Sequence, residues 1–374
     1  MPPLKLRQKQ TPKQNRVIET LRKEILGGTL KPQTKLPSQV EIAQRFKVSS
    51  VTAHMAVARL AREGFLYSRK RHGTFVTEKP PHLNNYALVF WNDPASHQGR
   101  QWSRYYTALT EEAIRIQQCE GRRMLLFHGI DQHVDSDDRQ RLMSYIESKR
   151  LGGIIFANSP QLLTGTPILE QPGIARVALM SQCAFDMPAV ASDYVMWFTK
   201  AFDYLVSQGR KRIAVIMIGT YRTTDELLTE LTKPRGITMP SRWRHTVSSG
   251  NFQAARNLIE LLMHNRPEER PDGLIIADDN LVEHCMAGLV LAGVRVPDDV
   301  AVVAHCSFPY PPPSVLPVKR LGYDIGEMLR TCIDVIDRQR RGETVPRETV
   351  LPALFEEELV ERQASVPAHA AAVS

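Results

Sequence analysis

The chain has 374 residues, which is more than one small module needs and predicts a small domain joined to a larger one. With 43% hydrophobic and 24% charged residues, its composition is that of an ordinary globular protein and excludes a fibrous or broadly disordered chain. Its apolar runs are far shorter than a membrane span, and residues 1–7 lack the apolar core of a signal peptide. We therefore expect a cytoplasmic protein without a membrane partner.

The five cysteines are scattered, odd in number and never arranged as a Cys-x-x-Cys pair. This pattern favours reduced thiols over a disulfide or zinc framework. Aspartates gather at 131–138, but that stretch lacks the central glycine and the terminal glutamate of a calcium loop, so we interpret it as an acidic loop. We expect no metal and no cofactor.

Charge is distributed unevenly along the chain. Residues 1–80 hold 17 Lys and Arg against five Asp and Glu, a formal net charge of +12, so the remainder carries −4 of the total of +8. A compact basic segment ahead of a mildly acidic body predicts a module that binds a polyanion. The alternative is a solubilising face or a basic tail.

Helical periodicity begins at Asn15, after residues 1–14, which we expect to form a flexible basic arm. Gly27–Gly28 ends this first helix. Ser38, followed three residues later by Glu41, predicts a second helix that starts with a capping box.

A third helix is predicted from Ser49, another capping residue, to about Glu63. Two short strands at 65–67 and 74–76 follow, with a basic hairpin tip between them. The candidates for the inner side of the third helix are Val51, Met55, Val57, Ala58 and Leu60. This order of elements predicts a winged helix-turn-helix over residues 15–77, in which one helix enters the DNA major groove and the hairpin contacts phosphates or the minor groove.

The same stretch resembles the DNA-binding domain of the GntR family. The motifs that carry the resemblance span the whole domain and are Glu24–Pro32, Leu36–Ser38, Val48–Ser49, Gly64–Leu66 and His72–Val76. In that family the contacts to DNA come from the second helix, the start of the third helix and the wing. By position, the resemblance implies DNA contacts from Ser38, Gln39, Ser49, Ser50, Thr52, His54, Lys70, Arg71, His72 and Gly73.

Three positions depart from the family pattern. Val40, Ser50 and His54 stand where the family often has arginine, the usual bidentate reader of guanine. The departure implies either an operator unlike that of typical relatives or weaker base readout with more reliance on phosphates and the wing. Ser49 is also explained as a helix cap, His54 as an exposed helical residue, and Lys70 and Arg71 as a solvated turn.

A polar, prolyl linker at 78–85 precedes a body at 86–365, and we expect residues 366–374 to be a disordered tail. In the body, strands are predicted at 86–91, 123–128, 153–156, 176–179, 212–218, 273–276 and 300–304, and helices at 104–120, 138–149, 196–208, 251–264, 281–292 and 324–340. This alternation predicts an α/β domain with parallel sheets. Its length predicts two lobes, with a ligand at the carboxyl ends of the strands.

The body resembles the effector domain of LacI/GalR regulators, which is akin to periplasmic binding proteins. The residues that carry this resemblance are 151–155, 192–193, 209–214, 270–280, 293–303 and 359–365. A GntR-type head on a LacI-type body resembles the arabinose-responsive type of repressor. The resemblance implies a homodimer on a double-stranded DNA operator, with a sugar or related metabolite as effector.

The effector site is matched less closely. Asp279 stands where the family has a cleft carboxylate, whereas His305 replaces one of its acidic residues. The other candidates, at or just after predicted strand ends, are Trp91, Asp93, Trp102, Tyr105, His128, Tyr221 and Arg222. Aromatic rings suit sugar faces and carboxylates suit hydroxyl groups, but each ring is also explained by core packing. A nonsugar effector, or a cleft that binds nothing, remains an alternative.

The sequence therefore predicts a DNA-binding regulator, a repressor by analogy, gated by a small molecule. One alternative is a regulator whose body only dimerises, or an architectural DNA binder. Another is an α/β enzyme, against which stands the absence of dinucleotide-binding, phosphate-loop, nucleophile-elbow and zinc-protease motifs from the sequence.

Overall fold

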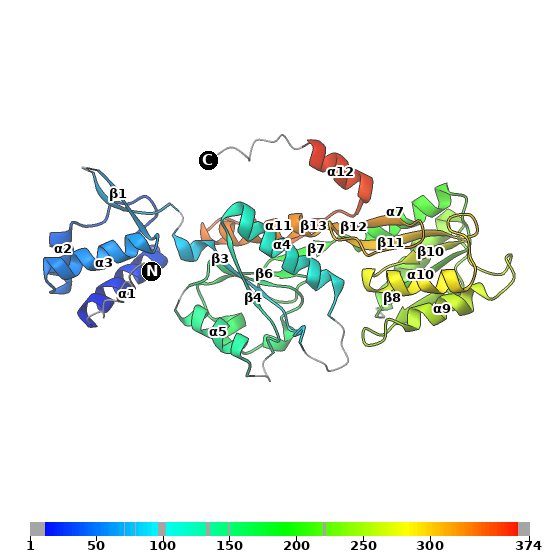
Figure 1. The fold of residues 1–374 in the computed structure, drawn as a ribbon, viewed down its shortest axis with the longest axis horizontal. Coiled ribbons are helices and arrows are strands. Elements are labelled where there is room, and N and C mark those ends of the chain that lie inside the picture. The colour runs from blue at the N-terminus through cyan, green and yellow to red at the C-terminus, as the bar shows by residue number, and fades with distance from the viewer. Residues whose placement is uncertain are drawn as a thin grey trace, which may run out of the picture.

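The computed structural model describes residues 12–70, 72–78, 80–95, 102–131, 135–148, 150–219 and 222–365. A small N-terminal domain is followed by two larger lobes, each built on its own sheet (Figure 1). This confirms the predicted fold class, a winged helix-turn-helix domain followed by a two-lobed α/β domain.

The N-terminal domain consists of three helices and a two-stranded antiparallel wing. Its elements are α1 (Pro12–Leu26), α2 (Gln39–Phe46), α3 (Ser50–Arg62), β1 (Leu66–Arg69) and β2 (Gly73–Val76). The first helix begins three residues before the predicted Asn15, at a proline that fits the first helical turn. The described helix therefore includes part of the stretch that the sequence suggested was an arm.

Both predicted helix caps are present. The Ser38 Oγ accepts a hydrogen bond from the Glu41 backbone N–H at 3.3 Å, and the Glu41 carboxylate accepts one from the Ser38 N–H at 2.6 Å. The Ser49 Oγ accepts from the Thr52 N–H at 3.2 Å. These caps satisfy backbone donors that have no partner inside the helix, and they fix where α2 and α3 begin.

One core prediction in α3 is wrong. Val51 is 68% exposed, whereas Val57 and Leu60 are buried as predicted. The buried stripe of α3 begins at Ala53 and recurs three and four residues later. Val51 lies two residues before it, about 200° around the helix, and therefore faces away from the core.

The first lobe, here the N-lobe, has a parallel sheet of order β13-β7-β6-β5-β3-β4. Helices α4 and α11 pack on one of its faces, and α5 packs on the other. The N-lobe elements are β3 (Asn85–Val89), α4 (Arg104–Glu120), β4 (Arg123–Phe127), α5 (Asp137–Glu147), β5 (Gly153–Phe156), α6 (Pro167–Glu170), β6 (Ala175–Leu179), β7 (Ala189–Ser192), α11 (Ile325–Arg340) and β13 (Glu348–Leu351).

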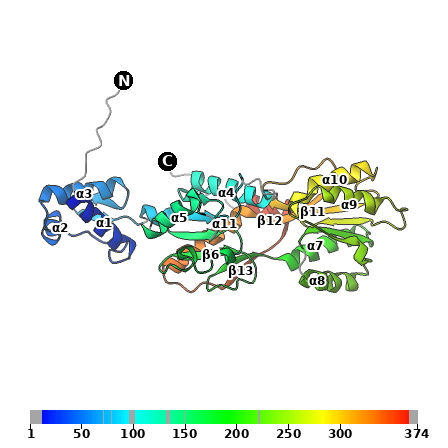
Figure 2. The ribbon, with the colours of Figure 1, turned by 90° about the horizontal axis from the view of Figure 1, so that it is seen from below.

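The second lobe, the C-lobe, has a sheet of order β14-β12-β11-β10-β8-β9, parallel except for β14. Helices α9 and α10 cover one face, and α7 and α8 cover the other (Figure 2). The C-lobe elements are α7 (Tyr194–Ser207), β8 (Ile213–Ile218), α8 (Arg222–Thr232), β9 (Arg244–Val247), α9 (Ala254–Met263), β10 (Gly273–Ile276), α10 (Val282–Leu291), β11 (Ala301–Phe308), β12 (Lys319–Asp324), β14 (Leu354–Phe355) and α12 (Glu356–Ser365).

The described chain passes between the lobes at 192–194, 324–325 and 351–354. Strand β12, which leads to the second passage, was not predicted because its sequence begins with two charges and contains Gly322. That glycine is required by close packing, since a Cβ built on it would lie 1.6 Å from the carbonyl oxygen of Cys306 on β11.

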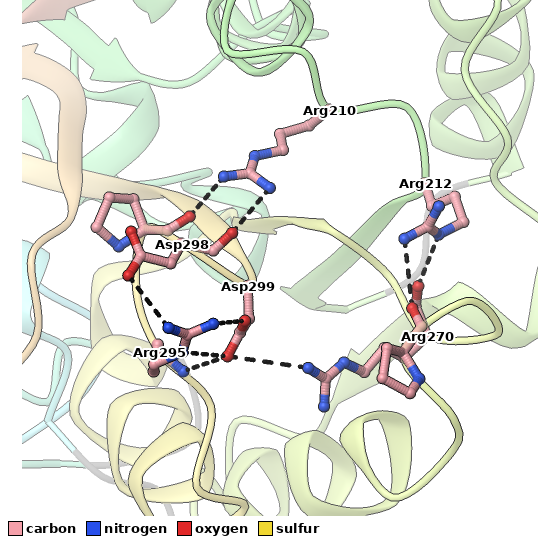
Figure 3. A network of polar contacts seen from close by, with 8 residues as sticks. Arg210, Arg212, Arg270, Arg295, Asp298 and Asp299 are labelled. Carbon is pink, nitrogen blue, oxygen red and sulfur yellow. Dashed lines mark hydrogen bonds and ion pairs between the residues drawn. The ribbon is translucent and has the colours of Figure 1, made fainter.

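The loops that precede the C-lobe strands are joined by arginines (Figure 3). The Arg210 guanidinium donates to the carbonyl oxygens of Pro297 at 2.6 Å and Asp298 at 3.1 Å. Arg295 donates to the Asp299 carboxylate from both its side chain, at 2.8 Å, and its backbone, at 3.0 Å.

A second group ties β8 to β10 at the same end of the sheet. The Asp272 carboxylate accepts from the Arg212 backbone N–H at 2.8 Å, and the Arg212 Nε donates to the Arg270 carbonyl oxygen at 2.9 Å. These contacts give a structural role to two motifs of the sequence, Arg-Pro-Asp-Gly at 270–273 and Val-Pro-Asp-Asp at 296–299.

Asp299 gives this network a pH dependence. Hydrogen bonds from Arg295 lower the pKa of the Asp299 carboxyl to about 2. A carboxyl whose pKa is lowered by folding adds stability above its unfolded pKa, and that stability is lost as the pH falls through the folded value.

We expect Asp299→Asn to lower the melting temperature at pH 7, and the difference from the parent protein to shrink as the pH is lowered from about 4 to 2. Asp298→Asn is the matched control, since its carboxylate lies 3.8 Å from Arg295 and should matter less. Equal melting curves for the parent and Asp299→Asn at pH 7 would contradict this role.

Candidate DNA-binding surface and effector site

The helix-turn-helix presents a polar surface. Ser38, Gln39, Ser49, Ser50 and His54 are exposed at the starts of α2 and α3. The predicted Thr52 is half-buried, with its hydroxyl 2.9 Å from that of Ser49. The two helices are joined by a tight turn in which Lys47 adopts left-handed backbone angles, φ 51° and ψ 53°. The turn therefore exposes a lysine between them, which the sequence analysis did not select.

The wing lies beside the segment that leads into α2. Gly73 has φ +109°, and a Cβ on it would lie 2.8 Å from the side chain of Lys35, so glycine is required there. Lys35 forms a bridge to Phe75 of β2, and the Leu36 N–H donates to the Thr74 carbonyl oxygen at 2.8 Å. This pairing joins the wing to the chain two residues before the cap of α2.

The predicted wing residues lie at its tip. Lys70 and His72 are exposed, whereas Arg71 lies outside the described residues. The neighbouring Arg69 stacks over the rings of Tyr67 and Phe75, 5.4 Å from each centroid. Arg69 therefore supports the hairpin, and the Lys70 side chain is left exposed to solvent.

On the N-lobe side of the body, aromatic rings gather at the carboxyl ends of β3 and β4. We name Phe90, Trp102, Tyr106 and His128 the aromatic cluster. His128 stacks on Phe90 with centroids 5.2 Å apart, and Trp102 lies 5.2 Å from Tyr106. Burial lowers the pKa of His128, although Asp138 opposes this effect, so a neutral ring is favoured.

The Tyr106 hydroxyl organises the edge of this cluster. It accepts from Trp91 Nε1 at 3.0 Å and from Asn158 Nδ2 at 2.8 Å. Trp91 is 37% exposed, so one of its surfaces remains open. Tyr106 is not predicted from the sequence, whereas the predicted Tyr105 donates from its hydroxyl to the Met328 sulfur on α11 at 3.4 Å.

On the C-lobe side lies a carboxylate cluster, which we define as Asp278, Asp279, His305 and Ser307. The predicted Asp279 is only 2% exposed, and its carboxylate accepts from the Ser307 hydroxyl at 2.7 Å. Burial raises its pKa, and the Ser307 hydrogen bond opposes that rise. Asp278, which the sequence analysis did not select, is the less buried of the two carboxylates. Burial and the charge of Asp279 raise its pKa.

His305 lies on β11 between two aromatic side chains. Its ring centroid is 5.7 Å from that of Trp197 and 5.8 Å from that of Tyr323. Its Nδ1 atom is buried and makes no hydrogen bond to the described residues. Burial lowers the pKa of His305, and the nearby Asp278 opposes this shift.

A contact across the interlobe cleft brings the two clusters together. The Arg104 N–H at the start of α4 donates to Asn280 Oδ1 at 2.9 Å, and Asn280 Nδ2 lies 3.4 Å from Ser103 Oγ. The Arg104 guanidinium also reaches the Glu283 carboxylate at 2.7 Å. Trp102, next to Ser103, thus stands at the lobe boundary.

The remaining predicted effector residues are less informative. Asp93 is exposed, and its carboxylate accepts from the Ala95 N–H at 2.8 Å. Tyr221 lies outside the described residues, as does the side chain of Arg222, the first residue of α8.

The hollow beside the aromatic cluster is small. It is lined by Trp91, Phe156 and Asn158, among others, and has a volume of about 10 Å³. A sugar-sized ligand needs about 300 Å³ or more. A larger groove of about 590 Å³ lies elsewhere, between α7 and α12, away from both clusters. The hollow beside the aromatic cluster is therefore too small for a sugar in the present arrangement of its side chains.

The described residues contain no group of three or more His, Cys, Asp or Glu that could hold a metal ion. The cysteines are free, and four of the five are buried. None of the helices in the described part of the chain is both long and apolar enough to cross a membrane.

The two domains match two family models. Residues 13–76 match the model of bacterial regulatory proteins of the gntR family, and residues 202–365 match that of the periplasmic binding protein-like domain. The chain thus joins a GntR-type winged helix-turn-helix to a periplasmic-binding-protein-like domain, the architecture of a transcription regulator.

Known proteins share this architecture over nearly the whole chain. The arabinose metabolism transcriptional repressor of Geobacillus stearothermophilus is 23% identical over 92% of this chain and 98% of its own length. The protein of the same name from Halalkalibacterium halodurans is 21% identical over 95% and 97%. The transcriptional repressor NagR of Bacillus subtilis is similar in the head alone, 40% identical over 17% of this chain and 26% of its own.

Solved structures share the fold of the body. A LacI-family regulatory protein from Chloroflexus aggregans is 18% identical with a TM-score of 0.56, over 73% of this chain and 96% of its own. A LacI-family regulator from Lactobacillus casei with bound sucrose is 16% identical with a TM-score of 0.52, over 73% and 98%.

We expect Ser307→Ala to destabilise the body by about 1.5–3 kcal/mol at pH 8, the usual cost of removing a hydrogen bond to a buried charged group. The raised pKa of Asp279 makes the loss larger above that pKa, where the carboxylate is ionised, and smaller in acid. Denaturant unfolding at several pH values measures it. Ser314→Ala, which removes a half-buried hydroxyl bonded to a carbonyl, is the control and should show no such pH dependence.

Proposed function

We propose that the chain is a sequence-specific transcription repressor that binds a DNA operator and is gated by a small, sugar-like ligand held between its lobes. The proposal assigns DNA binding to residues 15–77 and ligand binding and dimerisation to 86–365, with 78–85 as the linker. It assigns no catalysis to the body and places the protein in the cytoplasm, where its DNA would be.

The observation that carries the proposal is the joining of an exposed helix-turn-helix to a two-lobed body. The starts of α2 and α3 and the wing tip expose polar and basic side chains on the most basic part of the chain. In the body, the aromatic cluster of the N-lobe and the carboxylate cluster of the C-lobe lie on either side of the Arg104–Asn280 contact, and rings with carboxylates are a combination that binds sugars. The names of the full-length relatives, arabinose metabolism repressors, agree with this assignment.

The Asn280 contact supplies a route from ligand to lobe arrangement. Asn280 donates to Asp278 Oδ1 from its backbone N–H and from its side chain, each at 2.8 Å, while it also holds the start of α4. A ligand hydroxyl that donates to Asp278 competes for this oxygen and loosens the contact. A ligand acts in this way only if it binds the two lobe arrangements with different affinity.

Two copies would present two heads to a roughly palindromic operator, and a change in lobe arrangement would alter their spacing. In this scheme the ligand-free dimer binds the operator and the ligand releases it.

One observation favours a second candidate function, a regulator whose body only dimerises. The hollow beside the aromatic cluster, about 10 Å³, holds no sugar without movement. A thermal-shift screen of the full chain against arabinose, glucose, sucrose and sugar acids separates the two. A selective rise in melting temperature supports the gated repressor, and no rise with any compound favours the second candidate.

The DNA-binding half of the proposal is tested by selecting duplexes from a random library with the full chain. Enrichment of a repeated sequence supports it, and the absence of any enriched sequence contradicts it.

We expect the double substitution Lys70→Ala with Arg71→Ala to weaken binding of the enriched duplex and of random DNA by similar factors. Phosphate contacts carry no base information, so the salt dependence should flatten by a slope of about two. Fluorescence anisotropy at several salt concentrations measures both quantities. The control is Lys211→Ala in the body, which should change neither the affinity for DNA nor its salt dependence. Arg69→Ala is unsuitable as a control, because Arg69 supports the hairpin.

We expect Asp278→Asn to weaken binding of the sugar found in the screen by about tenfold or more, because a charged acceptor is lost. In the parent protein, sugar affinity should fall as the pH is lowered through the raised pKa of Asp278, and the variant should lose that dependence. Calorimetric titration measures the sugar affinity of both proteins between about pH 5 and 8, a range that spans a raised carboxyl pKa. Asp279→Asn tests the alternative assignment, and a larger effect there would contradict ours.

A further inference from the structure

Two large hydrophobic side chains are exposed in the described part of the N-terminal domain, residues 12–70 and 72–78. Val40 is 59% exposed and Val51 is 68% exposed. Each is the second residue of a helix of the helix-turn-helix, Val40 in α2 and Val51 in α3. Their coincidence on these two helix starts calls for an explanation beyond folding.

The packing of the domain does not require either valine. The core is formed from the opposite faces of the helices, including Ile42 and Phe46 in α2 and Leu60 in α3. An exposed valine adds no stability through the hydrophobic effect, and as a β-branched residue it slightly lowers the stability of a helix. A partner outside the domain is needed to bury Val51.

The surroundings of Val51 indicate which partner. Val51 stands between Ser50, which is exposed, and Thr52, and the exposed lysine of the interhelical turn, Lys47, precedes them. The charge of this segment, +12 over residues 1–80, favours a polyanion over an apolar protein surface. The first residues of a recognition helix meet base edges in the major groove, and of the four bases only thymine presents a methyl group there.

We propose that Val51 is a specificity-determining residue that reads thymine by packing its methyl groups against the 5-methyl group of the base. The inference rests on the proposed function and deepens it, since it states what one position of the operator must be. With no arginine at 40, 50 and 54, base readout at the start of α3 falls to serine, threonine and histidine side chains and to the methyl groups of Val51. Val40 lies on α2, the helix that crosses the DNA backbone in a helix-turn-helix. We expect it to add to the shape of the surface without contacting a thymine methyl group.

The test uses the full chain and the duplex that it enriches from a random library. Each thymine is replaced in turn by deoxyuridine, which removes only the 5-methyl group. We expect one thymine in each half-site at which the replacement weakens binding by about fourfold, the effect of one methyl group buried from water.

Val51→Ala is the decisive variant. It should fold as the parent does, because the side chain is exposed and alanine favours helix, and an unchanged melting curve checks this. It should bind the thymine duplex about as weakly as the parent binds the uracil duplex, and should no longer distinguish the two. Val40→Ala is the matched control and should keep the full preference for thymine.

The inference is overturned if no thymine responds to the replacement, if Val51→Ala keeps the parent's preference, or if Val40→Ala is the variant that loses it. Failure of the proposed function looks different, because then no duplex is enriched at all and the inference fails with it.

Discussion

The hydrogen bonds of Asn280 join the two lobes of the body and hold one of the candidate ligand carboxylates. Its side chain accepts from the start of α4 in the N-lobe and donates to Asp278 in its own lobe. Asn280 is 8% exposed, so these bonds are shielded from water and cannot be replaced by it without cost. The same amide group therefore orients Asp278 and helps to set the lobe arrangement, together with the Tyr310 hydroxyl, which donates to the Glu112 carboxylate of α4 at 3.1 Å.

The two clusters differ in composition. Rings predominate on the N-lobe, and acceptors predominate on the C-lobe, where Trp197 and Tyr323 also flank His305. The described chain passes between the lobes at 192–194, 324–325 and 351–354, so three segments join them. Coupling between a ligand and a distant DNA-binding head requires an element with two arrangements, and in the proposed function the boundary between the lobes is that element.

Local rules in the sequence predicted much of the fold. The caps at Ser38 and Ser49 follow from side chains that satisfy their own helix starts, so neighbouring residues suffice to predict them. Which face of α3 is buried was harder to predict. Val51 fits an apolar stripe at the start of the helix, and only the burial of Ala53 shows that the stripe lies on another face. The position of β12 depends on its close approach to Cys306, a contact between segments that a local pattern does not record.

The candidate site could be predicted only in part, because neighbouring residues face different surroundings. Motif position points to Asp279, yet the Ser307 hydroxyl, 28 residues later, donates to its carboxylate, and Asn280 donates to that of Asp278. Position at a predicted strand end points to Tyr105 rather than Tyr106, and the two hydroxyls have different partners because successive helical residues are about 100° apart. In each pair, the contact that decides comes from a distant part of the chain.

The most diagnostic motifs of the body make their bonds at the amino ends of the C-lobe strands, among Arg212, Asp272 and Asp299 (Figure 3). The candidate ligand residues lie at the opposite, carboxyl ends of the strands, where Asp278 follows β10. Because the resemblance rests on motifs at the amino ends of these strands, it indicates how the lobe folds and says little about which ligand it binds. In the proposed function, residues away from those motifs, among them His305 and the rings around Tyr106, would determine which ligand binds.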